Sequence, residues 1–429
     1  MNSIIHHVDN NLKDDMWSLL EELYPIPRTI IGEDYEKSLR IIENLIPIER
    51  ISFPSGASAG SWTIPKKWIV HEARIESLDG KVLIDFKNNS MHLWQYSISV
   101  DEIISRSELE KHLLSKKNIS NAIPHNVAFY SKTWGFSLTH SQKNKLIDEH
   151  YKVFIDSSFE DGELIVGQTI LPGLSKKEIL IDAVLSSPSL GNNTTGPVAA
   201  CYLAHELMKK KNRFYSYRFV FTPETIGPLV LHHLVDGFAE RVVGGYSLVN
   251  LADSNSFHYK KSRTGLTVTD KAIEHSLMWS KKKYSVRDYD VMSGSCGNEK
   301  AYNSLGCEIP IGSFHRGQLG SYPEYDTSMD DLTFVSKNKL FDSFKIINGA
   351  IEVLERNIKY QHTFNGEPFL SRYGIFDKIS NDSDRVPYDY LMAFTNGEFD
   401  LIEIANKAGI CISDFDEALT IMKEVKLIK

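Results

Sequence analysis

Cysteine and long hydrophobic runs are scarce in this sequence of 429 residues. Its four cysteines, Cys201, Cys296, Cys307 and Cys411, are widely spaced and form neither a metal-finger spacing nor a disulfide framework. Such usage is typical of a reducing compartment, so we expect a cytoplasmic protein. No apolar run approaches the roughly 20 residues that a helix needs to cross a bilayer, and the N-terminal segment is polar and acidic, unlike a signal peptide.

Positive charge is also in deficit. The chain has 48 Lys and Arg against 56 Asp and Glu, and the formal net charge of −8 disfavours a general nucleic-acid binder. The hydrophobic content of 42% is ordinary for a globular protein. At this length we expect two or three domains, each able to bury a core.

Changes of periodicity divide the chain. Helical spacing of apolar residues up to Pro47 gives way at Ile51 to short alternating stretches, such as WIVHEARIESLDGKVLIDF, which predict strands. We interpret residues 51–130 as a small inserted β-rich domain. After Tyr151 strands alternate with helices, which predicts an α/β sandwich with a largely parallel sheet, formed by residues 1–50 and 131–360.

Residues 361–429 have a pattern of their own. A helix, a turn, a short helix, a further helix and a strand-like end predict a winged-helix domain. Many such domains bind DNA, but this segment has 12 Asp and Glu against 7 Lys and Arg, a net charge of −5 that repels phosphate. We therefore expect packing against another domain or a protein contact, and DNA regulation is the weakest alternative.

The expected sheet brings several polar loops together, because ligands gather at the carboxyl ends of parallel strands. That rule selects residues 186–196, 223–227 and 252–259 and the stretch that leads to Tyr325. The first loop, SSPSLGNNTTG, is rich in hydroxyl and amide groups that could hydrogen-bond a polar ligand. An ordinary Ser/Asn/Gly turn has the same composition.

Six blocks of sequence, in order, resemble one family. They are SWTIPKKW, NAIPHNVAFYSKTWGFSL, FTPETIGPL, FHYKKSRTG, EIPIGSFHRG and GSYPEYDTSMDDL. Together they resemble the bacterial aminopeptidase-like proteins of the zinc-exopeptidase clan, over nearly the whole chain. The resemblance implies a three-layer α/β sandwich with an inserted β-rich domain, a C-terminal winged helix and, in the clan, a di-zinc centre.

Position by position, the resemblance implies a degenerate metal site. Ser187 stands where the family has a ligand His, and Asn193 stands where it has the metal-bridging Asp. Asp253 matches a later Asp ligand, and Asp326 replaces the closing His. Glu224 falls where the clan places its general base, so the resemblance makes it the candidate catalytic residue.

Other blocks depart from the family as well. Thr225 takes the place of a Glu ligand, and Asn298 stands where the family usually has an Asp, although Glu299 and Tyr302 are kept. Ser137 replaces the usual Cys of the WGF block.

The chemistry of these replacements argues against zinc. A catalytic zinc site needs three strong imidazole, thiolate or carboxylate ligands, whereas serine hydroxyl and asparagine carbonyl groups are neutral and weak. The residual metal candidates, Asp253 and Asp326, are oxygen donors that suit magnesium, calcium or manganese better. We therefore expect no cofactor and leave open a weakly bound divalent metal.

Further candidates for ligand binding follow later strands. The run FHYKKSR offers Tyr259, Lys260 and Arg263 for a carboxylate or phosphate group, and a solvated basic loop is the alternative. His315 and Arg316 follow the strand EIPIGSF and would point into the same cleft.

A pair of histidines, His232 and His233, suggests metal binding at first sight. Adjacent residues on a helix diverge by about 100°, so we expect these two to be structural and not to share an ion. Cys201 lies within a predicted helix, on a face that reads as buried, and is not expected to be a nucleophile.

Two functions of different classes remain. The first is an aminopeptidase-like protein that has lost the di-zinc centre and binds or processes an amino-acid-like or sugar-linked small molecule in a biosynthetic pathway. The second is an amide-bond enzyme, either a hydrolase with a non-standard metal or an acyl or aminoacyl transferase that uses Glu224 as general base. We expect a small-molecule or aminoacyl-type ligand, no nucleic acid and no membrane, and a homo-oligomer is compatible with the sequence.

Overall fold

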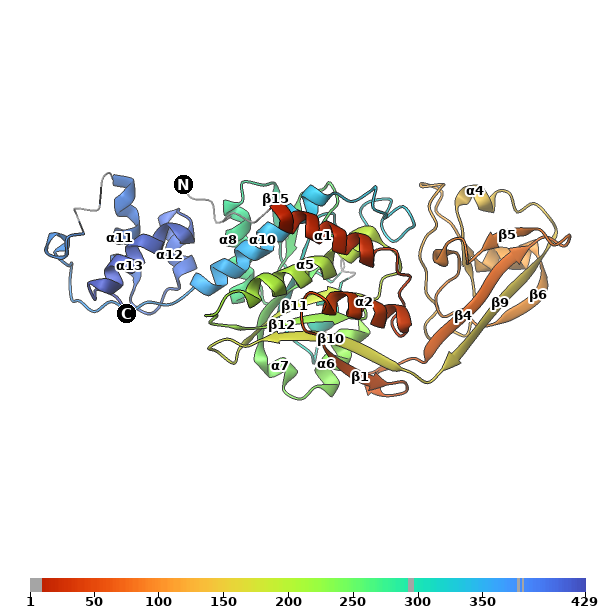
Figure 1. Ribbon diagram of the computed structural model, residues 1–429. Coiled ribbons are helices and arrows are strands. Elements are labelled where there is room, and N and C mark those ends of the chain that lie inside the picture. Colours follow the sequence, from red (N-terminus) through yellow and green to blue (C-terminus); the bar gives the residue numbers. More distant parts are fainter. Residues whose placement is uncertain (1–9, 292–296, 376–378, 380–381) are drawn as a thin grey trace.

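A mixed eight-stranded sheet forms the centre of the protein (Figure 1). The computed structural model describes residues 10–291, 297–375, 379 and 382–429. The middle strands β12, β11, β13 and β16 are parallel to one another. The pairs β1–β10, β10–β12 and β16–β14 are antiparallel, and the edge strand β15 is parallel to β14. In spatial order the strands are β1 (Glu49–Pro54), β10 (Glu163–Leu171), β12 (Ser216–Thr222), β11 (Glu178–Val184), β13 (Val242–Leu248), β16 (Ile311–His315), β14 (Phe257–Lys260) and β15 (Tyr284–Arg287).

Helices cover both faces of this sheet, so the predicted three-layer α/β sandwich is confirmed. On one face lie α1 (Asn10–Leu23), α2 (Glu33–Glu43), α5 (Gly191–Met208), α8 (Val268–Trp279) and α10 (Lys337–Arg356). On the other face lie α6 (Ile226–Leu234), α7 (Phe238–Arg241) and α9 (Glu299–Tyr302). Within the described residues, no helix combines the length and the apolar character needed to cross a membrane.

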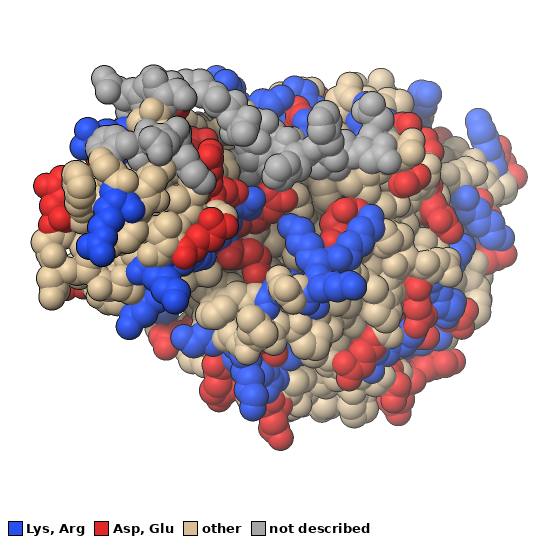
Figure 2. Space-filling view, turned by 60° about the vertical axis from the view of Figure 1, so that its left-hand side comes forward, with Lys and Arg blue, Asp and Glu red and all other residues tan. Residues whose placement is uncertain are grey.

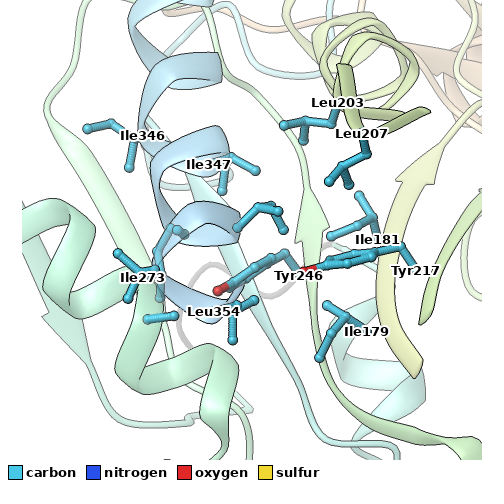
Figure 3. Close-up of a cluster of buried hydrophobic side chains, with 14 of the residues drawn as sticks. Ile179, Ile181, Leu203, Leu207, Tyr217, Tyr246, Ile273, Ile346, Ile347 and Leu354 are labelled. Atoms are coloured by element: carbon cyan, nitrogen blue, oxygen red, sulfur yellow. The ribbon is translucent and has the colours of Figure 1, made fainter. Parts of the chain in front are cut away.

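The strand β11 shows why this sheet forms. All seven of its residues are buried, as expected for a central parallel strand that is covered on both faces. Ile179 and Ile181 belong to one buried cluster with side chains of α5, α8 and α10, and Figure 3 shows Ile181 toward Leu207. Leu180, which points the other way, belongs to the second core.

The inserted domain is built on an antiparallel sheet of its own. Its order is β5 (Val82–Asp85), β4 (Lys67–Glu76), β9 (His150–Glu160) and β6 (Val100–Ser105). This sheet reaches Glu160, beyond the predicted boundary at residue 130, and β1 belongs to the central sheet. The boundary was hard to see because β9 leads into β10 through a two-residue connection, with no change in strand periodicity.

Short elements complete this part of the chain. The hairpin β2 (Ser58–Ala59) and β3 (Trp62–Thr63) packs beside α6. Between the longer strands lie the parallel pair β7 (Leu113–Leu114) and β8 (Phe136–Ser137), the helices α3 (Arg106–Leu109) and α4 (His140–Lys143), and the 3-10 turns η1 (Ser90–His92) and η2 (Glu110–His112).

The C-terminal domain is the predicted winged helix. It contains η3 (Leu370–Tyr373), α11 (Asp382–Phe394), α12 (Leu401–Ala408), η5 (Ile412–Phe415) and α13 (Asp416–Glu424). Its strand-like end pairs back, with a bridge between His362 and Ile428. Figure 2 turns this side of the molecule forward and shows basic and acidic side chains interspersed over the visible face.

Candidate functional site

A cavity of about 350 Å³ lies where the carboxyl ends of β11, β12 and β13 meet the inserted domain. The predicted loops supply its floor, with Ser187, Asn193 and Glu224 among the lining residues. The inserted domain and the β2–β3 hairpin supply an aromatic wall that includes Trp62 and Tyr130. Of the four stretches selected by the rule that ligands gather at strand carboxyl ends, residues 186–196, 223–227 and the stretch to Tyr325 contribute to this lining, whereas residues 252–259 do not.

The first loop is closed by hydrogen bonds between its own side chains. The Ser187 hydroxyl donates to the Asn193 Oδ1 atom at 2.6 Å. Ser187 lies in the loop between β11 and α5, and Asn193 lies in the first turn of α5, whose Asn192 backbone N–H donates to Asp330 Oδ1 at 2.7 Å. Burial raises the pKa of Asp330 to about 7, although the backbone hydrogen bonds to Asn192 and Asn193 favour its charged form.

Glu224 follows β12 and faces the cavity. Its backbone N–H donates to the Ser186 hydroxyl at 3.0 Å, which ties the second loop to the first. Enclosure by the protein raises the pKa of the Glu224 carboxyl to about 8, and the nearby charges of Asp326, Glu299 and Asp182 raise it further. Water still reaches this side chain, so Glu224 lies in a solvated recess and part of the repulsion is screened.

The turn after Glu224 is strained. Thr225 has φ 62° and ψ −56°, and the Ile226 N–H donates to the Glu224 carbonyl at 2.7 Å, which closes a three-residue γ-turn. Asn250 and Asp326 also line the cavity with positive φ values of 49° and 55°. Unfavourable backbone conformations of non-glycine residues concentrate at functional sites, so their presence here supports this cavity as the site.

A buried network holds the strained turn in place. Asn298 accepts a hydrogen bond from the Thr225 N–H at 2.8 Å and donates through Nδ2 to both oxygens of Asp182 at 3.0 Å. Asp182 is fully buried, and this burial raises its pKa to about 6. An aspartate at position 298 would place a second carboxylate against Asp182, whereas the asparagine both accepts and donates. The sequence marked Asn298 as a departure from the family but did not reveal this role.

Asp253 is fully buried and does not belong to the cavity lining. Its carboxylate accepts hydrogen bonds from the Asn192 amide at 2.9 Å, the Asn255 amide at 2.8 Å and the Gly317 N–H at 2.9 and 3.0 Å. A metal ion could use this carboxylate only if some of these bonds broke. Asp326, the second residual metal candidate, does line the cavity.

Asp326 contacts a residue that the sequence analysis missed. His125, from the inserted domain, lies with Nδ1 3.1 Å from Asp326 Oδ1, and its backbone N–H donates to the Asp326 carbonyl at 3.0 Å. The Nε2 atom of His125 is buried and has no hydrogen-bond partner in the described part of the chain. His125 stands in the family block NAIPHN, but nothing local in the sequence shows that this block meets Asp326.

The structure does not bring the remaining predicted residues into this cavity. Tyr259 donates to Asp270 at 2.6 Å, and Lys260 forms a fully buried ion pair with Glu299 at 2.7 Å. Arg263 pairs with Glu308 at 3.1 Å on the surface. His315 is buried against His258, and Arg316 donates to Ser343 and to the Asn255 carbonyl. Ser187, Asn193, Glu224 and Asp326 are the predicted residues that come together.

Comparisons with known proteins agree with this architecture. A family model described as a domain of unknown function (DUF4910) matches residues 17–357, and one described as winged helix-turn-helix matches residues 358–429. A Clostridium acetobutylicum protein, provisionally named a polysaccharide biosynthesis protein with an aminopeptidase-like domain, is 32% identical over 100% of both chains.

Solved structures show the same relationship. A crystal structure from Clostridium acetobutylicum, provisionally named a peptidase, is 31% identical with a TM-score of 0.89, covering 98% of this chain and 96% of that one. A zinc aminopeptidase from Bacillus subtilis has a TM-score of 0.59 at 12% identity, covering 79% of this chain and 94% of that one. The predicted resemblance to aminopeptidase-like proteins is thus confirmed.

Proposed function

The chain belongs to the family of the DUF4910 domain, and from that premise we propose that its aminopeptidase-like cavity binds an amine-bearing small molecule without paired zinc ions. The observation that carries the proposal is the 2.6 Å hydrogen bond between Ser187 and Asn193. At the two positions where the resemblance implies a ligand His and a bridging Asp, neutral side chains satisfy each other instead.

The donor set does not fit a di-zinc centre. Such a centre requires imidazole or carboxylate ligands and an anionic bridge between the two ions. Ser187 and Asn193 are neutral, and Asp253 already accepts hydrogen bonds on both oxygens. Glu224, Asp326 and Asp330 remain as carboxylates that line the cavity, a set that suits at most a weakly held magnesium or manganese ion.

The charge of the cavity favours a cationic group on the ligand. Glu224, Asp326 and Asp330 all line it, and the pKa of Glu224 is raised in part by Asp326. An ammonium group placed between Glu224 and Asp326 would relieve that repulsion and replace the proton on Glu224. The ligand's amine should therefore lie at this end of the cavity.

The opposite wall favours an apolar or ring-shaped body. The Trp62 and Tyr130 rings meet edge to face at 6.0 Å, and both side chains remain substantially exposed at the cavity. Rigid aromatic surfaces of this kind are typical of ligand sites. An amino-acid-like or sugar-linked amine has both parts, and the name of the Clostridium acetobutylicum relative, a polysaccharide biosynthesis protein, supports a place in a biosynthetic pathway.

Calorimetric titration tests this proposal. Full-length protein freed of metal by a chelator would be titrated with amino acids, aminoacyl conjugates, amino sugars and nucleotide sugars. We expect an amine-bearing compound to bind, and its affinity to fall at least about tenfold in Glu224→Gln and in Asp326→Asn. The control Asp101→Asn removes an exposed carboxylate from the inserted sheet and should leave binding unchanged.

Two results would contradict the proposal. One is binding that is equally strong in the wild type and in both cavity variants. The other is a near-stoichiometric divalent metal, measured by elemental analysis, that disappears in Asp326→Asn, because such a metal would occupy the cavity itself.

The raised pKa of Glu224 favours a second function, an amide-bond hydrolase or an acyl or aminoacyl transferase with Glu224 as general base. A carboxyl group with a pKa of about 8 lies in the range where proton transfer is efficient near neutral pH. The base must first be ionised, so turnover should rise with pH up to about 8, and Glu224→Gln should abolish it. Unchanged turnover in that variant would dismiss this function.

A further inference from the structure

We propose that His232, His233 and Cys307 bind one borderline-soft metal ion at a site separate from the cavity. One ligand atom from each of the three side chains lies within 4.8 Å of the other two. None of the three residues lines the cavity of Glu224 and Asp326. Metal binding at this site therefore does not depend on the ligand proposed for that cavity.

The two imidazole rings lie close together, although adjacent residues of a helix diverge by about 100°. Their rings meet at a centroid distance of 4.6 Å with an interplanar angle of 79°. They stand at the C-terminal end of α6, which ends at Leu234, and Val235 is extended with φ −116° and ψ 107°. The Cβ directions diverge, but the imidazole nitrogens lie far enough beyond Cβ to approach each other.

Cys307 supplies a third donor from a different part of the chain. It follows α9 in a turn where its N–H donates to the Ser304 carbonyl at 3.1 Å, and it is 9% exposed and not in a disulfide. The close approach of α6 and α9 brings this turn to the histidines.

Within the described part of the chain, one ring nitrogen of this cluster lacks a hydrogen bond. The Nδ1 atom of His232 is buried and has no hydrogen-bond partner among the described residues. Buried polar atoms are nearly always satisfied, so an unsatisfied ring nitrogen beside a thiol and a second imidazole indicates a missing bond. A side chain at Gly60 would place its Cβ 2.6 Å from His233 Nε2, so the β2–β3 hairpin closes one side. His233 itself is exposed and leaves the other side open to water.

The donor set selects the class of metal. One thiolate and two imidazoles suit zinc, or copper, better than magnesium or calcium, and water can complete a tetrahedral zinc shell. Bonds of about 2.0 to 2.3 Å place tetrahedral ligands about 3.4 to 3.7 Å apart, so ligand atoms that now lie within 4.8 Å of one another must close by at most about 1.4 Å. Rotation of the exposed His233 side chain can supply that movement.

A bound ion would join α6 to the turn after α9. The other end of α6 begins at the strained turn of Thr225 in the cavity, so the cross-link would anchor the helix that carries this turn. We assign the ion a structural role on this basis, because none of the three residues belongs to the described cavity lining.

Cobalt(II) titration of the full chain, stripped of metal with a chelator and kept reduced, tests the site. We expect one equivalent of cobalt to bind. The complex should show a sulfur-to-cobalt charge-transfer band and the intense visible bands of tetrahedral cobalt, and added zinc should displace the cobalt. Cys307→Ser should abolish the charge-transfer band, and His232→Ala should weaken binding at least about tenfold. Cys411→Ser, in the C-terminal domain, should retain both signals, and a thermal melt of each variant shows that it is folded.

Three outcomes would overturn the assignment. These are cobalt binding without a charge-transfer band, a band that persists in folded Cys307→Ser, and no binding at micromolar cobalt. Asp326→Asn should leave the cobalt spectrum intact, and loss of the spectrum in that variant would place the ion in the cavity instead. Ligand binding in the cavity does not enter this readout, so failure here and failure of the proposed function remain distinguishable.

Discussion

At the scale of single residues, the cavity is a place where backbone strain and unfavourable charge are concentrated. Thr225, Asn250 and Asp326 have positive φ values, at an approximate cost of 1–3 kcal/mol each. Glu224 and Asp330 have raised pKa values. None of these features stabilises the fold, so their coincidence in one cavity is most simply explained by ligand binding.

Replacing Thr225 by glycine tests the strain directly. Glycine adopts positive φ without steric cost, but it loses more conformational entropy on folding than threonine does. The relief of strain should exceed this entropy cost, so Thr225→Gly should raise the free energy of unfolding by about 1 kcal/mol. The urea midpoint at constant m measures this change. The control Thr264→Gly, at an exposed residue outside the positive-φ set, should lower stability by up to about 1 kcal/mol. Equal losses in both variants would mean that Thr225 is not strained.

Asp330 should make stability depend on pH. Its folded pKa of about 7 lies above the ordinary value of 3.8, so between these values the folded state binds more protons than the unfolded state. The free energy of unfolding should therefore fall as pH rises from about 4 to 7, by at most about 4 kcal/mol. Asp330→Asn should flatten this slope in urea titrations at pH 4.5 and 7.5, and the surface variant Asp101→Asn should keep it. A slope that is unchanged in Asp330→Asn would contradict the prediction.

At the scale of elements, the sheet is joined by polar as well as apolar contacts. Arg218 of β12 donates to both carboxylate oxygens of Glu178 of β11, at 2.7 and 3.0 Å, with side chains only 4% and 6% exposed. This pair fixes the register of two parallel strands whose carboxyl ends form the cavity. A buried charge without its partner is costly, so the strand pair depends on both residues.

Breaking this pair should destabilise the sheet strongly. Glu178→Gln leaves the Arg218 charge buried, and we expect the free energy of unfolding to fall by about 3 kcal/mol or more. Glu43→Gln is the matched control, because its pair with Arg50 is equally short at 2.7 Å but lies on the surface. The fall in the free energy of unfolding caused by Glu43→Gln should stay below about 1 kcal/mol. Similar losses in the two variants, measured by urea unfolding, would show that burial does not set the strength of the pair.

The elements also show what the sequence could and could not predict. Strands such as KEILIDAVLSS and the loops after them could be predicted, because a buried central strand is a continuous apolar run that ends in polar residues. Lys260 and His315 were misplaced because both belong to strands, β14 and β16, and periodicity alone does not say which face a strand residue takes. His125 was missed because its contact with Asp326 spans 201 positions in the sequence.

At the scale of the whole molecule, the winged helix is part of the main core rather than a separate appendage. Apolar residues of α10, among them Ile351 and Leu354, belong to the same buried cluster as Leu401 and Ile404 of α12. Lys271 of α8 also bonds to Asp400 at 3.0 Å and to Glu403 at 2.9 Å. The interdomain packing expected from the acidic composition is therefore present.

This shared core predicts the effect of removing the domain. A chain that ends at residue 357 would expose the apolar faces of α8 and α10, so we expect its melting temperature to fall by at least about 5 °C, measured by calorimetry. Lys271→Ala, which removes the ion pairs and leaves the apolar contact, should shift the melting temperature far less, because partly exposed pairs contribute little. The full chain should melt in one transition, since the same apolar cluster stabilises both parts. Two separate transitions, or a truncated chain as stable as the full one, would show that the winged helix folds and acts independently of the cavity-bearing domain.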